Sequence, residues 1–149
     1  MRISVVGGGY VGLVSAVCFS ELGHIVNLIE IDQEKVKSIN QGRPPIYEKS
    51  LEEMLLAHLG RNMLVNASYE SLPDSEIVLI CVGTPPCLDG GADLSMIASC
   101  SKSIGSALQD CDGYHIVAVK STVPPGTTER LVQPVVLSQS SKGINVEAK

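Results

Sequence analysis

The sequence contains no tryptophan and one phenylalanine, and its 11 Lys and Arg side chains are outnumbered by 16 Asp and Glu. Its net charge of −5 and pI of about 5.1 argue against a nucleic-acid partner, because binding a phosphate backbone requires clustered cations. No apolar run approaches the roughly twenty residues that a membrane-spanning helix needs. The first apolar stretch follows a single Arg2 and is interrupted by three glycines, unlike a signal sequence. We therefore expect a cytoplasmic protein without a membrane or nucleic-acid partner.

Patterns that hold metals or disulfides are also missing. The five cysteines form no C-x-x-C pair, and the histidines at 24, 58 and 115 lack the spacing of metal ligands. We expect reduced cysteines, with Cys18, Cys81 and Cys100 buried and Cys87 in a loop. Asp89 and Asp93 lack further oxygen ligands nearby, so no metal site is predicted.

A glycine turn near the start of the chain is the most informative feature. Residues 2–6 are an apolar, β-branched run typical of a buried strand, and Gly7, Gly9 and Gly12 follow in the spacing G-x-G-x-x-G. Apolar residues then recur at helical intervals over residues 10–22, and Gly23 ends the helix. Their positions predict that Val11, Val14, Ser15, Cys18, Phe19 and Leu22 form its repeating face.

An acidic residue completes this unit. Residues 25–30 read as a second strand that ends in Glu30. The order strand, glycine turn, helix, strand and acidic tip is typical of a dinucleotide-binding βαβ unit. In such a unit the phosphates bind at the helix N-terminus, while the carboxylate accepts hydrogen bonds from the adenosine ribose and repels a 2′-phosphate. The sequence thus favours NAD over NADP, with Lys35 near the ribose or a phosphate.

The remaining pattern alternates strands and helices and predicts an α/β fold of the Rossmann type, with a doubly wound, mainly parallel sheet and helices on both faces. The expected helices are residues 33–40, capped by Asp32, 51–59, capped by Ser50 with Glu53, 94–108, capped by Asp93, and a helix from Thr127 or Thr128 to 137. The expected strands are residues 63–67, 77–82, 115–119 and the onset of another at 144–146.

Several stretches together resemble the nucleotide-sugar dehydrogenases, the UDP-glucose/GDP-mannose dehydrogenase family. These are GGGYVGL at 7–13, INQGRPPIYE at 39–48, VGTPP at 82–86 followed by DGGADLS, and KSTVPPGTTE at 120–129. The resemblance covers nearly the whole chain. It departs from the family at Glu30, where Asp is usual, and at Lys49-Ser50, where Pro-Gly is more frequent.

The resemblance implies an NAD-dependent, two-step oxidation of the primary alcohol of a nucleotide sugar, with UDP-glucose to UDP-glucuronate as the leading reaction. Thr122 would support catalysis beside the nicotinamide. The expected cofactor-binding residues are Gly7, Gly9, Tyr10, Val11, Gly12, Glu30, Lys35, Val82, Gly83, Thr84, Pro85 and Thr122. A nucleotide-sugar partner and homo-oligomerisation are implied for the full-length enzyme.

The family's nucleophilic cysteine, catalytic lysine and glutamate motif have no match in these residues. We therefore expect residues 1–149 to be an NAD-binding domain, part of a longer chain, and inactive when isolated. GDP-mannose or UDP-N-acetylmannosamine dehydrogenase remains an alternative within the family. A non-catalytic NAD-sensing module is an alternative of another class.

Overall fold

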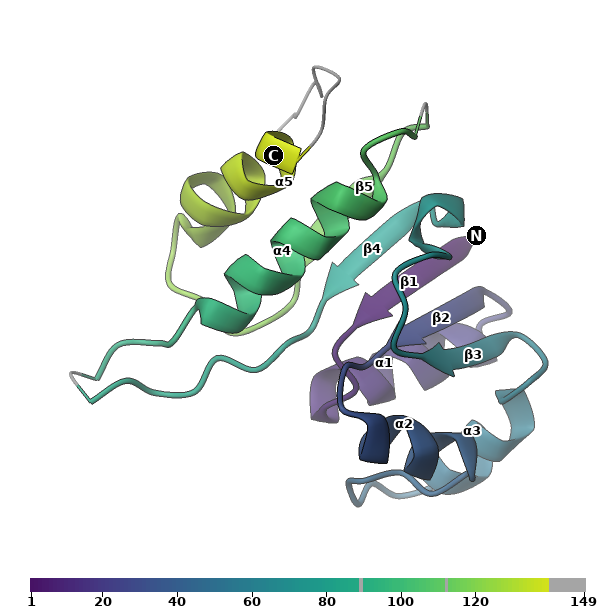
Figure 1. The fold of residues 1–149 in the computed structure, drawn as a ribbon. Coiled ribbons are helices and arrows are strands. Elements are labelled where there is room, and N and C mark those ends of the chain that lie inside the picture. Colours follow the sequence, from purple (N-terminus) through teal and green to yellow (C-terminus); the bar gives the residue numbers. More distant parts are fainter. Residues whose placement is uncertain (89, 112, 140–149) are drawn as a thin grey trace.

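The computed structural model describes residues 1–88, 90–111 and 113–139. Its centre is a five-stranded parallel sheet in the order β3-β2-β1-β4-β5 (Figure 1). The strands are β1 (Arg2–Val6), β2 (Ile25–Ile29), β3 (Met63–Asn66), β4 (Ile77–Ile80) and β5 (Ile116–Val119). This order confirms the doubly wound α/β fold. The expected strand at residues 144–146 lies outside the described residues.

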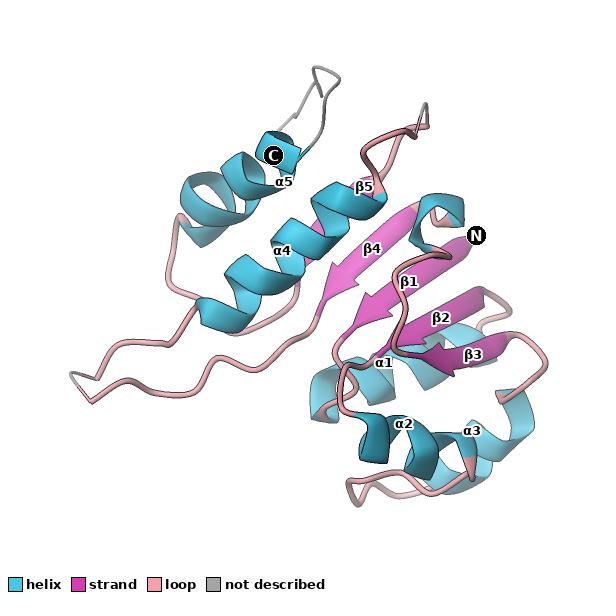
Figure 2. Cartoon of the chain, in the orientation of Figure 1, coloured by secondary structure: helices cyan, strands magenta, loops and turns pink. Residues whose placement is uncertain are grey.

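Helices cover both faces of the sheet (Figure 2). One face carries α1 (Tyr10–Glu21), α2 (Gln33–Asn40) and α3 (Leu51–His58), and the other carries α4 (Ser95–Ala107) and α5 (Gln133–Gln139). The single helix expected after Thr127 is instead a π-helical segment, η2 (Thr128–Val132), followed by α5. A short 3-10 turn, η1 (Leu72–Asp74), precedes β4. Within the described residues, no helix is long and apolar enough to cross a membrane.

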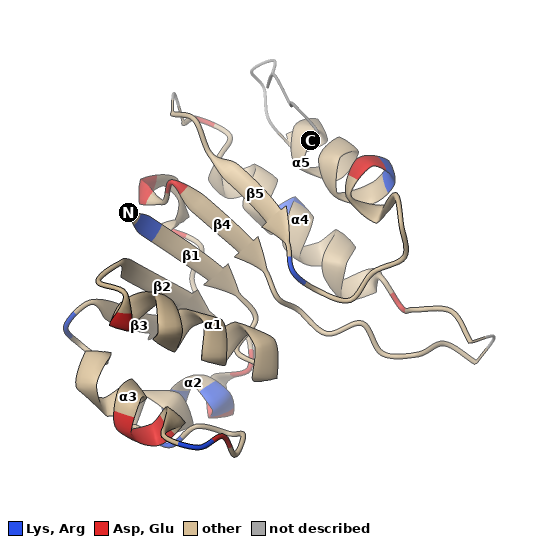
Figure 3. Cartoon of the chain, turned by 180° about the vertical axis from the view of Figure 1, so that it is seen from behind, with Lys and Arg blue, Asp and Glu red and all other residues tan. Residues whose placement is uncertain are grey.

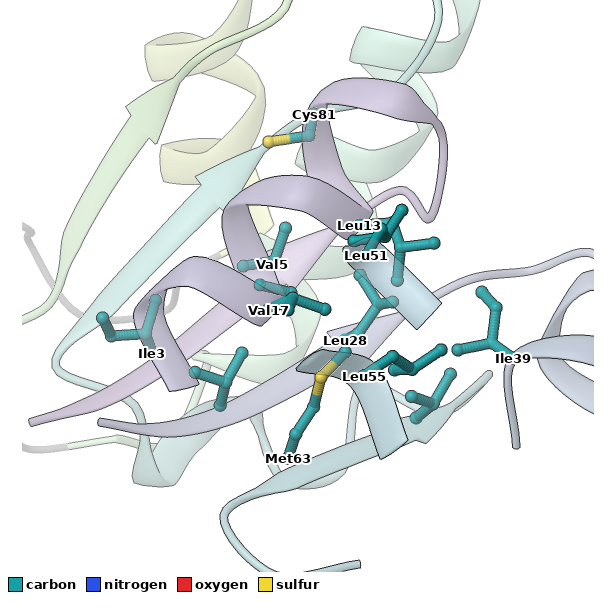
Figure 4. Close-up of a cluster of buried hydrophobic side chains, with 13 residues drawn as sticks. Ile3, Val5, Leu13, Val17, Leu28, Ile39, Leu51, Leu55, Met63 and Cys81 are labelled. Carbon is teal, nitrogen blue, oxygen red and sulfur yellow. The ribbon is translucent and has the colours of Figure 1, made fainter. Parts of the chain in front are cut away.

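Each face has its own hydrophobic core. On the α1 side, side chains of β1 and β2 such as Val5 and Leu28 pack against Leu13 and Val17 of α1 and Leu55 of α3 (Figure 4). On the α4 side, the core joins β4 to α4 and α5. Burial of this apolar surface stabilises the helices on both faces of the sheet. Because all the strand pairs are parallel, the carboxyl ends of the strands lie along one edge of the sheet.

The buried face of α1 differs from the prediction. The helix buries Gly12, Leu13, Ala16, Val17 and Ser20, whereas Val11, Cys18 and Leu22 are exposed. The helix is apolar nearly all round, so its periodicity does not select a face. Small residues such as Gly12 and Ala16 face the sheet because they permit a close approach of helix and strand.

Two predicted helix caps also change. Ser50 has φ +65° and makes no side-chain cap hydrogen bond, because this left-handed conformation is not the extended one that a capping serine needs. Asp93 accepts a hydrogen bond of 2.8 Å from the backbone N–H of Ser95, although the residue that borders α4 is Leu94. Asp32 caps α2 as predicted, through Glu34 and Lys35.

Candidate cofactor-binding site

The glycine turn between β1 and α1 is closely packed against its surroundings. Gly7 has φ +104°, and a Cβ there would lie 2.8 Å from the Cys81 carbonyl oxygen. A Cβ at Gly12 would lie only 1.8 Å from the Gly7 carbonyl oxygen. Glycine is therefore required at both positions by the turn itself and by the packing of α1 on the sheet.

Gly9 differs from these two glycines. Its φ of −75° is accessible to any residue, and no atom of the described residues lies within 4 Å of a Cβ built on it. Gly9 precedes α1, where no side chain caps the helix and the Leu13 N–H donates to the Gly9 carbonyl. The preceding N–H groups of the first turn have no intrahelical acceptor and form the positive end of the helix. The open space at Gly9 and these donors together fit an anionic group such as a phosphate.

Glu30 lies beside this turn at the tip of β2, with 7% of its surface exposed. Its carboxylate accepts hydrogen bonds from the Gly8 N–H at 2.8 Å and the Asp32 N–H at 3.0 Å. The Lys35 ammonium lies 3.9 Å from the same carboxylate. A carboxylate has about four acceptor positions, so these contacts leave acceptors for ribose hydroxyls.

The loops after β4 and β5 are joined by their hydroxyl groups. The Thr84 hydroxyl donates to the Thr122 carbonyl at 2.8 Å, and the Ser121 hydroxyl donates to the Val82 carbonyl at 2.7 Å. Gly83 and Pro85 are exposed in the β4 loop. The resemblance placed Thr84 and Thr122 at one cofactor, and the structure shows that these two residues are in direct contact.

Cys81 lies between the glycine turn and the loops that follow β4 and β5. Its carbonyl lies against Gly7, and its N–H donates to the Val6 carbonyl at 2.8 Å. The glycine turn, Glu30 and the β4–β5 loops therefore occupy one edge of the sheet, and Figure 3 shows the arrowheads of β1, β4 and β5 ending at that edge. Tyr10 and Val11 open α1 at this edge with exposed side chains.

The two buried cysteines, Cys81 and Cys100, are not activated. Burial raises the pKa of the Cys81 thiol to about 11, although the Lys120 charge opposes this, and burial raises that of Cys100 to about 12. Both thiols stay neutral near pH 7, so neither is a ready nucleophile. Cys81 and Cys100 are buried as predicted, whereas Cys18 is exposed, contrary to prediction. The described residues contain no cluster of His, Cys, Asp and Glu suited to a metal ion.

Sequence reasoning missed three contributors to this edge. Gly8 donates to Glu30, Ser121 joins the β4 and β5 loops, and Glu48 accepts a hydrogen bond from the Tyr10 hydroxyl. Gly8 and Ser121 lie inside recognised motifs, but the motif spacing does not single them out. Glu48 is 38 positions from Tyr10, and nothing in the sequence pairs them.

Comparison with known proteins identifies the domain. Residues 1–149 match the NAD binding domain of the UDP-glucose/GDP-mannose dehydrogenase family. The chain is 46% identical over 134 residues to UDP-glucose 6-dehydrogenase of Pseudomonas aeruginosa, covering 88% of this chain and 29% of that protein. It is 40% identical over 149 residues to GDP-mannose 6-dehydrogenase of Azotobacter vinelandii, covering 99% of this chain and 34% of that protein.

Solved structures agree with the sequence relatives. A ternary complex of GDP-mannose dehydrogenase from Pseudomonas aeruginosa matches with a TM-score of 0.90 and 39% identity, over 95% of this chain and 33% of that chain. A UDP-glucose dehydrogenase from Pyrobaculum islandicum matches with a TM-score of 0.88 and 40% identity, over 93% of this chain and 33% of that chain. The chain thus spans about a third of the length of these relatives. It belongs to the UDP-glucose/GDP-mannose dehydrogenase family, a family of NAD-dependent nucleotide-sugar dehydrogenases, and is its NAD-binding domain.

Proposed function

We propose that this chain binds NAD at the β1–α1 turn and serves, within a longer enzyme, the oxidation of a nucleotide sugar's primary alcohol to the uronic acid. The observation that carries the proposal is Gly9. Neither its backbone conformation nor any neighbour among the described residues requires glycine there. A ligand that approaches the backbone closely supplies the missing reason, and a pyrophosphate at a helix N-terminus is such a ligand.

Each predicted residue has a role in this proposal. The backbone from Gly7 to Gly12, including Tyr10 and Val11, receives the pyrophosphate. Glu30 accepts hydrogen bonds from the adenosine ribose, and Lys35 balances its charge from 3.9 Å. The two joined loops, through Val82, Gly83, Thr84, Pro85 and Thr122, line the cofactor on the β4–β5 side, with Thr122 supporting the reaction beside the nicotinamide. Bound NAD would supply the hydride acceptor.

A melting experiment tests NAD binding directly. A ligand that binds only the folded state stabilises it by about 2.7 kcal/mol at a hundred times its Kd. We expect NAD or NADH to raise the melting temperature of the chain in a concentration-dependent way. If neither does so at millimolar concentration, the β1–α1 turn is not a working cofactor site in this chain.

The substrate belongs to the same proposal, with UDP-glucose in first place. Similarity to UDP-glucose 6-dehydrogenase supports this choice, and the GDP-mannose relatives keep GDP-mannose as the main alternative. We also propose contact with the nucleotide sugar and self-association for the full-length enzyme. Expression of the entire open reading frame, assayed for NADH with UDP-glucose, GDP-mannose and UDP-N-acetylmannosamine, identifies the substrate. Binding of NAD without NADH formation from any of them would instead indicate an NAD sensor.

We propose that the chemistry is not carried by residues 1–149 themselves. The raised pKa of Cys81 and of Cys100 supports this, because covalent catalysis requires a thiolate. We expect the purified chain to produce no NADH from UDP-glucose and NAD. Sustained NADH production by this chain would contradict the assignment.

A further inference from the structure

The first residue of α1 is joined to a distant loop. The Tyr10 hydroxyl donates a hydrogen bond to the Glu48 carboxylate, although 38 positions separate them. Tyr10 directly follows Gly9, and 54% of its surface is exposed. The contact therefore connects the first turn of α1, where the phosphate is proposed to bind, with the connector formed by residues 43–50 between α2 and α3.

The connector is fixed on both sides of Glu48. On one side, Ile46 packs against the core of the α1 face. On the other side, the Leu51 N–H donates to the Glu48 carbonyl at 3.2 Å, and Leu51 is only 3% exposed. Figure 4 shows Leu51 beside Leu13 of α1. The backbone of Glu48 is therefore held at a defined position relative to α1.

The connector is also stiff at its start. The backbone of Arg43 donates to the Ser38 carbonyl at 3.0 Å, and the Ser38 hydroxyl donates to the Arg43 carbonyl at 2.7 Å. Pro44 and Pro45 follow, and proline restricts both its own backbone and that of the residue before it. Little backbone entropy therefore remains to be lost in the connector when the Glu48 side chain contacts Tyr10.

We propose that Glu48 is a positioning residue for the cofactor phosphate site: by accepting the Tyr10 hydrogen bond, it fixes the Tyr10 ring and the first turn of α1 so that the turn's N–H groups stay open to the pyrophosphate. This inference rests on the proposed NAD binding at that turn. Its ligand chemistry is the diphosphate that NAD shares with ADP.

The first turn of α1 requires such support because it has few restraints of its own. No side chain caps the helix at Gly9, and no acidic residue lies in its first turn. A helix end without a cap frays easily, and a fraying first turn disperses the donors that a phosphate needs. By restraining Tyr10, the first residue of the helix, the Glu48 contact opposes this fraying.

The contact affects binding more than stability. Glu48 and Tyr10 are both exposed, and hydrogen bonds between exposed groups contribute little to the free energy of folding. A positioned donor set, by contrast, acts on every hydrogen bond made to the ligand. The Glu48 carboxylate also raises the pKa of the Tyr10 hydroxyl, first through the hydrogen bond and then through its charge. This shift gives the contact its own spectroscopic signal.

The test is a double-mutant cycle on the Kd values of NAD and ADP, measured by calorimetry on the chain. Tyr10→Phe and Glu48→Ala should each raise both Kd values about three- to tenfold, and the double variant should be no worse than either single one. Glu48→Gln should restore binding, because an amide oxygen still accepts the hydroxyl proton. Tyr47→Phe and Glu52→Gln are matched controls, since neither of these exposed residues makes a side-chain hydrogen bond within the described part of the chain. Melting temperatures without ligand should remain close to that of the parent chain.

Tyrosinate absorbance tests independently whether the contact exists in solution. The sequence has four tyrosines and no tryptophan, and burial raises the pKa of Tyr69 to about 12, so the variants are needed to identify the step that belongs to Tyr10. Glu48→Ala should shift one tyrosine to lower pH, and Tyr10→Phe should remove that same step. Additive effects in the double variant, or single variants with unchanged Kd values, would overturn the positioning role while leaving NAD binding intact. Failure of the parent chain itself to bind NAD and ADP would overturn both proposals.

Discussion

The glycine turn and the β4–β5 loops lie at the same edge of the sheet but are built in different ways. In the turn, backbone packs on backbone: Gly7 and Gly12 are each closed off by a carbonyl oxygen, and only Gly9 faces open space. In the loops, side chains join one loop to the other: the hydroxyls of Thr84 and Ser121 each donate a hydrogen bond to a backbone carbonyl of the neighbouring loop. The turn is held by backbone packing at Gly7 and Gly12, whereas the loops depend on hydrogen bonds that can change partners.

This difference predicts different ligand behaviour in the two regions. The donors of the α1 N-terminus have no acceptor within the helix, so the proposed phosphate would bind them without breaking a hydrogen bond of the helix. The Thr84 hydroxyl already donates to Thr122, so donation to a cofactor requires it to leave that carbonyl. We therefore expect substitutions in the turn to have large effects on binding and those in the loops to have moderate effects.

The largest effects should come from valine at Gly9 and at Gly12. Gly9→Val places its side chain where the phosphate is proposed to bind, so we expect near-native melting and a Kd for NAD raised about a hundredfold or more. Gly12→Val forces a Cβ into the Gly7 carbonyl, so we expect a loss of about 1–3 kcal/mol of stability. Thermal unfolding with and without NAD separates the two outcomes.

Gly83→Ala is the matched control in the β4 loop. Within the part of the chain that the structure describes, a Cβ at Gly83 would meet only the Met96 sulfur, at the ordinary contact distance of 3.6 Å, so the fold should be unaffected. A normal NAD-induced shift in Gly9→Val, or equal destabilisation by Gly9→Val and Gly12→Val, would contradict the distinction between a ligand glycine and two packing glycines.

A smaller effect is expected at Glu30. The carboxylate should reject a 2′-phosphate, so the parent chain should bind NADH more tightly than NADPH. Glu30→Gln removes the repulsive charge and leaves Lys35 unpaired, so the preference should shrink about tenfold. Calorimetric titration of both cofactors measures the ratio. Equal affinity of the parent chain for NADH and NADPH would show that Glu30 does not face the ribose.

Moderate weakening is the prediction for Thr84→Val in the joined loops. The change removes the hydroxyl that donates to Thr122 and keeps the branched shape. Loss of one hydrogen bond corresponds to about a two- to tenfold rise in the Kd for NAD. Glu70→Gln, at an exposed position away from these loops, serves as the control. A hundredfold loss in Thr84→Val would mean that the loops, rather than the turn, dominate binding.

The same contrast explains how much the sequence revealed. The glycine turn was predictable because Gly7 and Gly12 are required by backbone conformation and close packing within one short segment, and such local requirements appear in the sequence as a fixed spacing of glycines. The face of α1 was not, because Val11 and Leu22 are as apolar as the buried Leu13. Packing against the sheet decides between these faces, and periodicity does not contain that information.

The sequence also failed to predict one backbone conformation and several contacts between distant residues. Ser50 matches a capping box, but its backbone adopts φ +65° and no cap forms. The Tyr10–Glu48 contact and the Ser121 hydrogen bonds join segments brought together only by the fold. Motif resemblance assigned Thr84 and Thr122 to one site, but it did not predict the hydrogen bond from the Thr84 hydroxyl to the Thr122 carbonyl.

The smallest expected effect concerns the cysteine between the two regions. Cys81 has a pKa of about 11, above its ordinary value of 9.0, so near pH 8 the exposed Cys18 and Cys87 should react with a thiol reagent long before it. Because folding raises this pKa, its contribution to stability is complete below pH 9 and is lost as the pH rises through 11. Mass spectrometry of the labelled chain gives the order of reaction. Early labelling of Cys81 would mean that the turn and the β4 loop separate readily.

The most direct test of the account is a two-dimensional amide spectrum of the isotope-labelled chain during titration with NAD. We predict the largest shifts at the amides of Gly9, Tyr10 and Val11, with smaller ones near Glu30 and in the 82–85 loop. Larger shifts in the β4 loop than in the turn would reverse the proposed ranking of the two regions. Shifts confined to the surface depression lined by Tyr69, Lys102 and Ser106 on the α4 side would contradict a cofactor site at the glycine turn.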